Sequence, residues 1–406
     1  MNDRAPLPAR AERESALQRT RHALPAILSE LGEIAASGNA EQKTLPPDVY
    51  DCADLFELEC ERIFRPGWLL MGRADQVASP GDFMSVDVIG EPLVLTRDMR
   101  GELHVFSRIC RHRWMPICQG SGNATALECP YHAWTYELDG RLRGAPEMTD
   151  SVSFRRNERG LIPIRHEVWE GFVFVNLDGR AEPLAPRLEP LLEELKEFRL
   201  SECVTVASRD YGEQPWDWKV AQDNGDCYHH IGLHRKTAQW LWPIQKIWYR
   251  PDNGHYALNG CGTAPDALVT AEDGRPVMPG LFQPLPGLTA HQRENLYLVF
   301  IYPNYWIGPG PDQTLVTRMF PVGPGRVRFY TDILFHRSNL DHPELQAKID
   351  EAKRFWFEIN DEDFYAHTAV QQAARSRFAD RGPLSSKEDY VRAFAKWYAQ
   401  QISAAR

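Results

Sequence analysis

Apolar residues recur every three or four positions in several segments of the chain, which is the spacing of one face of a helix. The longest such segment is 343–376, and its apolar side carries Leu345, Ile349, Ala352, Phe355, Trp356 and Ile359. Shorter segments with the same spacing are 12–36, 53–64, 188–198 and 386–402, and a further helical stretch is expected near 215–235. These patterns predict helices that each bury one side.

Other segments are short, rich in β-branched and aromatic residues, and separated by turn signals. Strands are predicted at 83–89, 92–97, 103–109, 133–138 and 172–177, the fourth of them ending at an Asp-Gly turn. Further along, strands are predicted at 203–210, 296–302, 314–320 and 326–336. The chain is therefore expected to be α+β, with a small antiparallel β domain followed by an antiparallel sheet backed by a long C-terminal helix.

The order of these elements divides the chain of 406 residues into four parts. We expect an N-terminal helical extension at 1–45, a linker or start of the second domain at 46–65, the small β domain at 66–175, and the α+β domain at 176–406.

Composition limits the classes of function. The formal net charge of −10 argues against a nucleic-acid partner, and no apolar run reaches about 18 residues, so no membrane span is expected. No secretory segment opens the chain, and acidic residues near the start argue against a transit peptide. A cytoplasmic location is expected, and in a reducing compartment well-placed Cys and His indicate metal binding or catalysis.

Two Cys-His pairs lie inside the predicted β domain. Cys110 and His112 form a C-x-H pair, and Cys129 and His132 form a C-x2-H pair after sixteen intervening residues. A structural zinc site is one alternative, but zinc ribbons usually offer two Cys from each loop. The pairs fit a [2Fe–2S] cluster in which Cys110 and Cys129 bind one iron and His112 and His132 bind the other.

A second group of candidate ligands lies between residues 223 and 234. Two pairs of His are open on spacing alone. His230 and His234 would share one helix face, whereas His229 and His234 would need a bulge or a helix end. A zinc-protease motif is excluded because Ile231 stands where that motif needs Glu. A non-heme iron also needs a carboxylate, and the acidic run Asp361–Asp363 in the long predicted helix offers candidates.

The chain resembles the Rieske oxygenases over about residues 46–400. The matching text is CRHR at 110–113 and CPYHAWTYELDGRL at 129–142. Respiratory Rieske proteins are similar here too, but they carry an extra Cys in each loop. In this chain Cys118 follows the first loop and the second loop has no counterpart, which favours the oxygenases.

The resemblance implies roles for particular residues. Asp226, His229 and His234 match the family pattern D/E-x2-H-x4-5-H, so His229 and His234 are expected to bind a mononuclear iron, with His230 as a neighbour. Asp226 is expected to link His132 of one subunit to His229 of the next. Glu362-Asp363 followed by Val370-Gln371 matches the family segment that carries the carboxylate ligand, which makes Asp363 the third ligand and Asp361 or Glu362 the fallback.

The resemblance also implies a fold and a function. The catalytic domain is expected to be a helix-grip fold, and the chain a terminal oxygenase in a head-to-tail homotrimer. A separate ferredoxin or flavin reductase would supply electrons from NAD(P)H, since the chain has no dinucleotide-binding motif. We expect hydroxylation of a small aromatic compound, an aromatic acid in particular, with N- or O-demethylation of a quaternary ammonium or methoxy compound as the alternative. A pure electron-transfer protein and a metal-dependent hydrolase are the competing classes.

Overall fold

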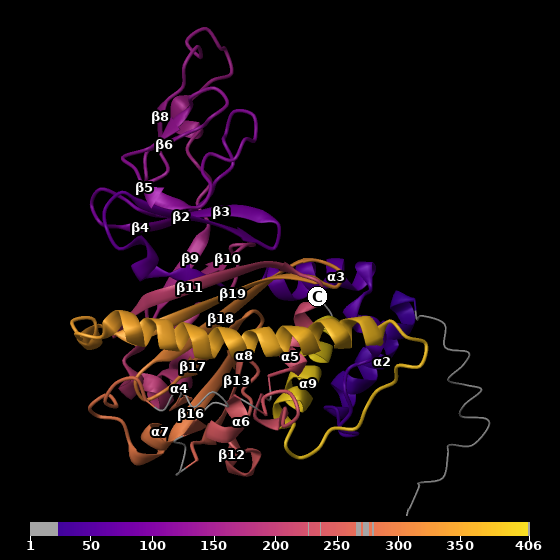
Figure 1. Cartoon of the computed structure of the whole chain (residues 1–406). Coiled ribbons are helices and arrows are strands. Elements are labelled where there is room, and N and C mark those ends of the chain that lie inside the picture. Colours follow the sequence, from indigo (N-terminus) through magenta and orange to yellow (C-terminus); the bar gives the residue numbers. More distant parts are fainter. Residues whose placement is uncertain are drawn as a thin grey trace, which may run out of the picture.

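The computed structural model describes residues 23–225, 227–235, 237–264, 269–270, 276–277 and 280–404. In Figure 1 a small β domain projects from a larger body in which a long helix crosses an antiparallel sheet. Among the described residues, no helix combines the length and the apolar character needed to cross a membrane.

The N-terminal helices pack against the C-terminal end of the chain. They comprise α2 (Leu24–Ser37), α3 (Ala53–Glu59) and the π turn η2 (Cys60–Phe64), with a 3-10 turn, η1 (Pro47–Tyr50), between the first two. Helix α2 contacts α9 (Asp389–Ser403) and buries Ile27, Leu31 and Ile34. The predicted helix at 12–36 is thus confirmed from residue 24 onward, and its first part lies outside the described residues.

The small β domain consists of three antiparallel sheets. The first has the order β4-β3-β2-β5, the second β6-β7-β8 and the third β1-β10-β9. Their strands are β1 (Leu69–Arg73), β2 (Asp82–Val88), β3 (Glu91–Arg97), β4 (Leu103–Ser107), β5 (Ser121–Asn123), β6 (Leu127–Glu128), β7 (Thr135–Tyr136), β8 (Leu142–Gly144), β9 (Arg165–Trp169) and β10 (Phe172–Asn176). Strand β7 is shorter than expected because the residues before it fold into a tight loop, in which the Cys129 N–H donates to the Trp134 carbonyl at 2.8 Å.

The larger body is built on a seven-stranded antiparallel sheet. Its strands are, in sheet order, β11 (Cys203–Gln214), β19 (Arg326–His336), β18 (Thr314–Gly323), β17 (Tyr305–Pro309), β16 (Asn295–Ile301), β13 (Tyr256–Gly262) and β12 (Ile247–Tyr249). The long helix α8 (Leu345–Ala374) crosses one face of the sheet (Figure 1). Helix α4 (Ala185–Leu195) and the sheet β1-β10-β9 contribute to the core on the other face. The remaining short elements are α6 (Ala238–Leu241), α7 (Ala290–Glu294), β14 (Val269–Thr270) and β15 (Pro276–Val277). The α+β class and the helix grip are confirmed.

The predicted helical stretch near 215–235 is wrong for most of its length. Helix α5 covers only Trp218–Asp223, and the chain then passes through Gly225 into the 3-10 turn η7 (Cys227–His229) and irregular turns. A Cβ atom at Gly225 would lie 2.2 Å from the Tyr390 ring and 2.9 Å from the Phe300 ring. The backbone approaches these rings so closely that only glycine fits, and the helix ends where this approach begins.

Strands β13 and β17 were not predicted, because neither has a clear alternating pattern. In β13, a Cβ atom at Gly260 would lie 2.3 Å from the Trp248 ring of the neighbouring strand. The strand therefore carries a glycine where a strand pattern calls for a side chain.

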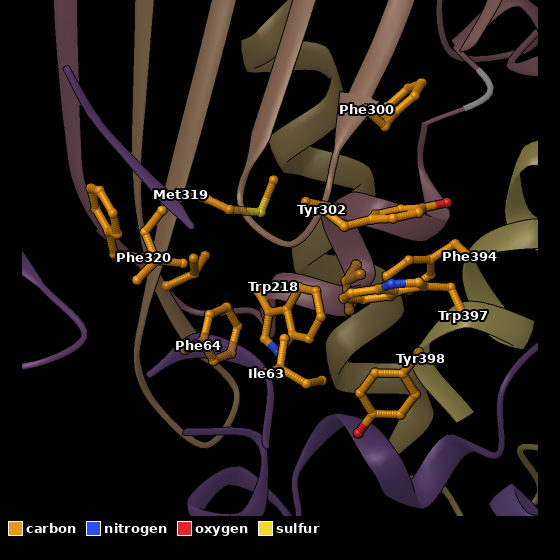
Figure 2. Close-up of a cluster of buried hydrophobic side chains, with 14 of the residues drawn as sticks. Ile63, Phe64, Trp218, Phe300, Tyr302, Met319, Phe320, Phe394, Trp397 and Tyr398 are labelled. Carbon is orange, nitrogen blue, oxygen red and sulfur yellow. The ribbon is translucent and has the colours of Figure 1, made fainter. Parts of the chain in front are cut away.

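A buried aromatic cluster joins the N-terminal helices, α5 and α9. Figure 2 shows Trp218 between Phe64 and Tyr398, with Phe394 and Trp397 beyond. The Trp218 indole donates to Glu59 at 2.9 Å, and Lys219 forms buried ion pairs of 2.6 Å with Glu59 and Asp217. Because breaking a buried ion pair costs several kcal/mol, these contacts hold α5 in a fixed position at the entrance to the segment 223–234.

Candidate metal centres

The two loops that carry the Cys-His pairs repeat one backbone structure. In the first loop (110–115), the Cys110 N–H donates to Met115 and the Trp114 N–H donates to Cys110. In the second loop (129–134), Cys129 donates to Trp134 and Ala133 donates to Cys129 in the same way. Trp114 and Ala133 both adopt a left-handed backbone, with φ of 60° and 54°. The four predicted ligands are thus presented by two matched turns.

The side chains of these loops face one another. The rings of His112 and His132 lie 4.6 Å apart, and His112 stacks on Trp134 at 4.8 Å. Nδ1 of His112 is buried and finds no hydrogen-bond partner among the described residues. Burial, together with the charges of His132 and Arg113, lowers the pKa of His112, so its ring is neutral and Nδ1 can bind a metal.

The Cys side of the same loops is equally suited to metal. Cys110 and Cys129 are each 1% exposed, and their thiols contact each other. Burial and, to a smaller extent, this contact raise the pKa of the Cys129 thiol. The Tyr136 hydroxyl lies 3.3 Å from Cys110 Sγ and accepts from the Arg111 N–H at 2.9 Å. Its own hydrogen is therefore available to a Cys110 thiolate. The donor set of two buried thiols and two imidazoles fits a [2Fe–2S] cluster.

The second site combines His230, His234 and Asp363, and we call it the His–Asp site. One nitrogen of each His and one oxygen of Asp363 lie within 4.8 Å of one another. His234 is fully buried, and its Nε2 is 3.1 Å from Asp363 Oδ1. Nδ1 of His230 lies 4.0 Å from the same oxygen and has no hydrogen-bond partner among the described residues. Two imidazoles and a carboxylate are the donors of a non-heme iron site.

Neighbouring side chains fix the orientation of these donors. Glu362 Oε2 lies 2.8 Å from His234 Nδ1 and accepts from the Thr237 hydroxyl at 2.6 Å. A carboxylate on one ring nitrogen directs the other nitrogen toward the site, which is how metal-binding His is usually held. Asn224 donates to Asp363 Oδ1 at 2.8 Å. Burial opposes ionisation of Asp363, but its contact with His234 and the charges of His234, His367 and His230 lower its pKa.

One predicted ligand, His229, does not lie beside His234 and Asp363 in the structure, so its role as a ligand stays a prediction. His229 was expected in the site, but its Nδ1 faces Glu388 Oε1 at 3.8 Å and His230 takes its place beside His234 and Asp363. The 3-10 turn ends at His229, and the His234 N–H then donates to the His230 carbonyl at 3.0 Å. This single helical turn puts His230 and His234 on one side.

The other candidates are also accounted for. Asp226 lies outside the described residues, so its linking role remains a prediction. Of the fallback carboxylates, Asp361 is exposed and lies 3.5 Å from Arg209, whereas Glu362 holds His234.

Sequence reasoning missed three residues at this site. These are Glu362 in its supporting role, Asn224 and His367. His367 follows Asp363 by four positions on α8 and is 2% exposed, and burial lowers its pKa to about 4. The helical spacing from Asp363 was the signal that could have identified His367.

A further group consists of Asp98 and Glu102 in the turn between β3 and β4 and His104 within β4. Asp98 accepts from the N–H groups of Arg100 and Glu102 at 2.9 and 2.8 Å. Burial raises its pKa, but these bonds and those from His104 and the Arg100 side chain outweigh burial and lower it to about 2. The contacts are those of a closed turn, and we assign no metal to it.

Family models match both regions. The Rieske [2Fe–2S] domain matches residues 67–155, and the catalytic domain of the ring hydroxylating alpha subunit matches residues 201–404. Two curated relatives extend the similarity. The oxygenase subunit of glycine betaine monooxygenase from Chromohalobacter salexigens is 27% identical over 398 residues, covering 88% of this chain and 86% of the relative. The oxygenase subunit of carnitine monooxygenase from Acinetobacter pittii is 34% identical over 209 residues, covering 51% and 56%.

The alpha subunit of biphenyl 2,3-dioxygenase from Rhodococcus jostii is 35% identical over 196 residues, covering 46% of this chain and 42% of the relative. Among solved structures, a quaternary ammonium Rieske monooxygenase aligns with a TM-score of 0.77 at 25% identity, covering 92% of this chain and 98% of that one. The matched domains carry a Rieske [2Fe–2S] cluster and a mononuclear iron, which the donor sets of the two sites fit. The chain therefore belongs to the Rieske oxygenase alpha subunits and is an oxidoreductase of that family.

Proposed function

We propose that this oxygenase hydroxylates a carbon bonded to the nitrogen of a quaternary ammonium compound. The observation that carries the proposal is the similarity to a glycine betaine monooxygenase subunit along 88% of the chain. The similar biphenyl dioxygenase subunit aligns with less than half of it. The comparisons thus favour the demethylation alternative over hydroxylation of an aromatic acid, which was the main expectation from the sequence.

We assign the cofactors to the residues described above. Cys110, Cys129, His112 and His132 would hold the [2Fe–2S] cluster. His234 and Asp363 would hold the mononuclear iron, with one imidazole of the pair His229-His230. Geometry supports His230, while the spacing of the family pattern supports His229. An iron with two imidazoles and one carboxylate has open positions at which oxygen can react beside a substrate.

Side chains around the His–Asp site have defined tasks in this proposal. Glu362 holds the ring of His234, and Asn224 holds the Asp363 carboxylate. The loop that carries the His pair packs through Gly225 on Phe300 and Tyr390, whose rings stack at 3.8 Å.

The overall reaction balances as follows. A C–H bond next to the charged nitrogen becomes C–OH with one oxygen atom of O2, and the other atom leaves as water with two electrons and two protons. The C–N bond of the product then breaks, its electron pair stays on nitrogen as a tertiary amine, and the carbon becomes an aldehyde as the hydroxyl proton leaves. The electrons would come from NAD(P)H through a separate reductase or ferredoxin, as is usual for Rieske oxygenases.

An exposed apolar tip surrounds the Cys-His loops. Trp114 is 82% exposed, Tyr131 53% and Met115 40%. Since exposed apolar patches commonly mark protein interfaces, we propose that this tip docks on a second copy of the chain in a head-to-tail trimer. Inter-subunit electron transfer described for the quaternary ammonium monooxygenase supports the arrangement. Asp226 would then link His132 to the iron ligands of the next subunit.

A substrate screen tests the proposal. The iron-loaded protein is incubated with oxygen and a surrogate reductase, with glycine betaine, carnitine or an aromatic acid as substrate, and products are read by mass. We expect an aldehyde and a tertiary amine from a quaternary ammonium compound, and none from an Asp363→Asn control. A hydroxylated ring from the aromatic acid, with no turnover of either quaternary compound, would contradict the proposal.

A further inference from the structure

His367 is the buried titratable residue near the His–Asp site that has no role so far. Helix α8 places Asp363, His367 and Gln371 one turn apart on the same side, and all three are buried. Gln371 accepts from the Asp217 N–H and donates to the Tyr50 carbonyl, both at 2.9 Å. Asp363 is held by Asn224 and lies beside His234. His367 differs from both neighbours because its ring nitrogens make no hydrogen bond to a described residue.

Neither ring nitrogen of His367 has a hydrogen-bond partner among the described residues. The ring packs edge-on against Trp216 at 4.6 Å, and the buried indole N–H of Trp216 also lacks a partner among them. A buried polar group without a partner destabilises the fold, whereas an apolar ring would fill the same space without this cost. An imidazole at this position is therefore unfavourable unless a polar group binds to it.

The titratable groups that act on His367 belong to the His–Asp site. Helix α8 places His367 one turn from Asp363, and Asp363, His230 and His234 all act electrostatically on its ring. It is not itself one of the three donors that lie within 4.8 Å of one another. A small polar molecule bound between His367 and these donors would satisfy the unpartnered imidazole.

We propose that His367 donates a hydrogen bond to the small ligand that occupies the open side of the His–Asp site. The inference rests on the proposed function, because it needs iron in that site. His367 is then not a ligand and not an inert part of the core. It contributes by stabilising a polar molecule next to the metal.

Azide is a suitable probe, since it binds open positions on iron and accepts hydrogen bonds. Azide is added to the iron-loaded holoenzyme in the presence of nitric oxide, with which it competes for the iron. The decrease in the electron paramagnetic resonance signal of the iron–nitrosyl complex gives the dissociation constant of azide. The variants are His367→Phe, which keeps ring size, and His367→Gln, which keeps a donor. Tyr365→Phe on the exposed side of the same helix is the matched control.

We expect His367→Phe to retain iron and to bind azide about 5- to 10-fold more weakly, which corresponds to one hydrogen bond. His367→Gln should stay within about two-fold of the unmodified protein, and Tyr365→Phe should not change. Unchanged azide affinity in His367→Phe would overturn the inference, and so would loss of iron in both His367 variants. Absence of iron from the unmodified chain would instead overturn the proposed function.

Discussion

The two metal regions of this chain are built in opposite ways. The Cys-His loops lie close together in sequence and repeat the same pair of backbone hydrogen bonds. The His–Asp site joins a short irregular segment to the middle of α8, and His234 and Asp363 are 129 residues apart. One region is a local construction on small strands, and the other depends on the packing of a helix across a sheet.

The difference shows in what supports each donor set. In the Cys-His loops, backbone hydrogen bonds position the donors, and one side-chain contact is added between Tyr136 and Cys110. In the His–Asp site, side chains hold the donors, since Glu362 orients His234 and Asn224 holds Asp363. We therefore expect changes in single supporting side chains to affect the His–Asp site more strongly than the Cys-His loops.

The largest effect is expected for Asp363→Asn. Loss of the carboxylate should reduce the iron content from about three to about two per chain and abolish turnover, while the cluster spectrum stays. Metal analysis and the visible spectrum check this. His112→Ala is the counterpart that should remove the cluster spectrum and leave the mononuclear iron. Loss of both centres in either variant would show that they are not independent.

The adjacent imidazoles form a matched pair of variants. With the ligand set of the structure, His230→Ala should lose the mononuclear iron and His229→Ala should keep it. The reverse result would favour the family spacing and would mean that the turn at 227–234 rearranges around the metal. Metal content of both proteins, prepared side by side, decides between them.

Glu362→Gln should have a smaller effect on the same site. The glutamine amide can still contact His234 Nδ1. It lacks the negative charge with which Glu362 favours the ring form whose Nε2 is free to bind the metal. Removal of such a support typically lowers metal affinity about 10- to 100-fold. Competition with a chelator measures it, and Glu358→Gln, one turn away on the exposed part of α8, is the control. Equal affinity in the two variants would remove Glu362 from the site.

Tyr136→Phe tests the support of the Cys-His loops. The tyrosine hydroxyl can donate to the Cys110 sulfur, which favours the reduced cluster. Losing one hydrogen bond of about 1 kcal/mol should lower the reduction potential by about 40 mV for one electron. Redox titration of the cluster signal gives the value. A higher potential in the variant would contradict this reading of the contact.

The smallest effects concern pH, and the two regions should respond with opposite signs. Asp98 in the β domain has its pKa lowered to about 2, so its contribution to stability is present above pH 4 and is lost as the pH falls toward 2. Burial, opposed by the Tyr50 hydrogen bond, raises the pKa of Asp223 to about 7. Its folded pKa exceeds the unfolded value of 3.8, so that contribution is lost progressively as the pH rises from the unfolded value to 7.

Unfolding measured between pH 2 and 9 checks these signs. Asp98→Asn should flatten the profile at the acid end, and Asp223→Asn should flatten it between about pH 4 and pH 7 and raise stability at pH 8 relative to the unmodified chain. A destabilised Asp223→Asn variant at pH 8 would show that the ionised carboxylate stabilises the fold.

The sequence predicted more of the local region than of the distant one. Cys110, His112, Cys129 and His132 could be identified because both pairs lie in short loops and the spacing within each is visible. Asp363 was found through the resemblance, and spacing could not choose between His229 and His230, because the choice depends on a turn set by the approach of Gly225 to Tyr390. The support from Glu362 could not be predicted, since it depends on where α8 lies on the sheet.

The central claim is that this chain uses both centres to oxidise a quaternary ammonium compound. The most direct test measures oxygen uptake and tertiary amine together, in the iron-loaded protein with a surrogate reductase and glycine betaine or carnitine. The account predicts equal amounts of oxygen consumed and amine formed, with both lost in Asp363→Asn and in His112→Ala. Amine formation that persists without either centre, or a reduced cluster that never leads to uptake of oxygen with these substrates, would contradict it.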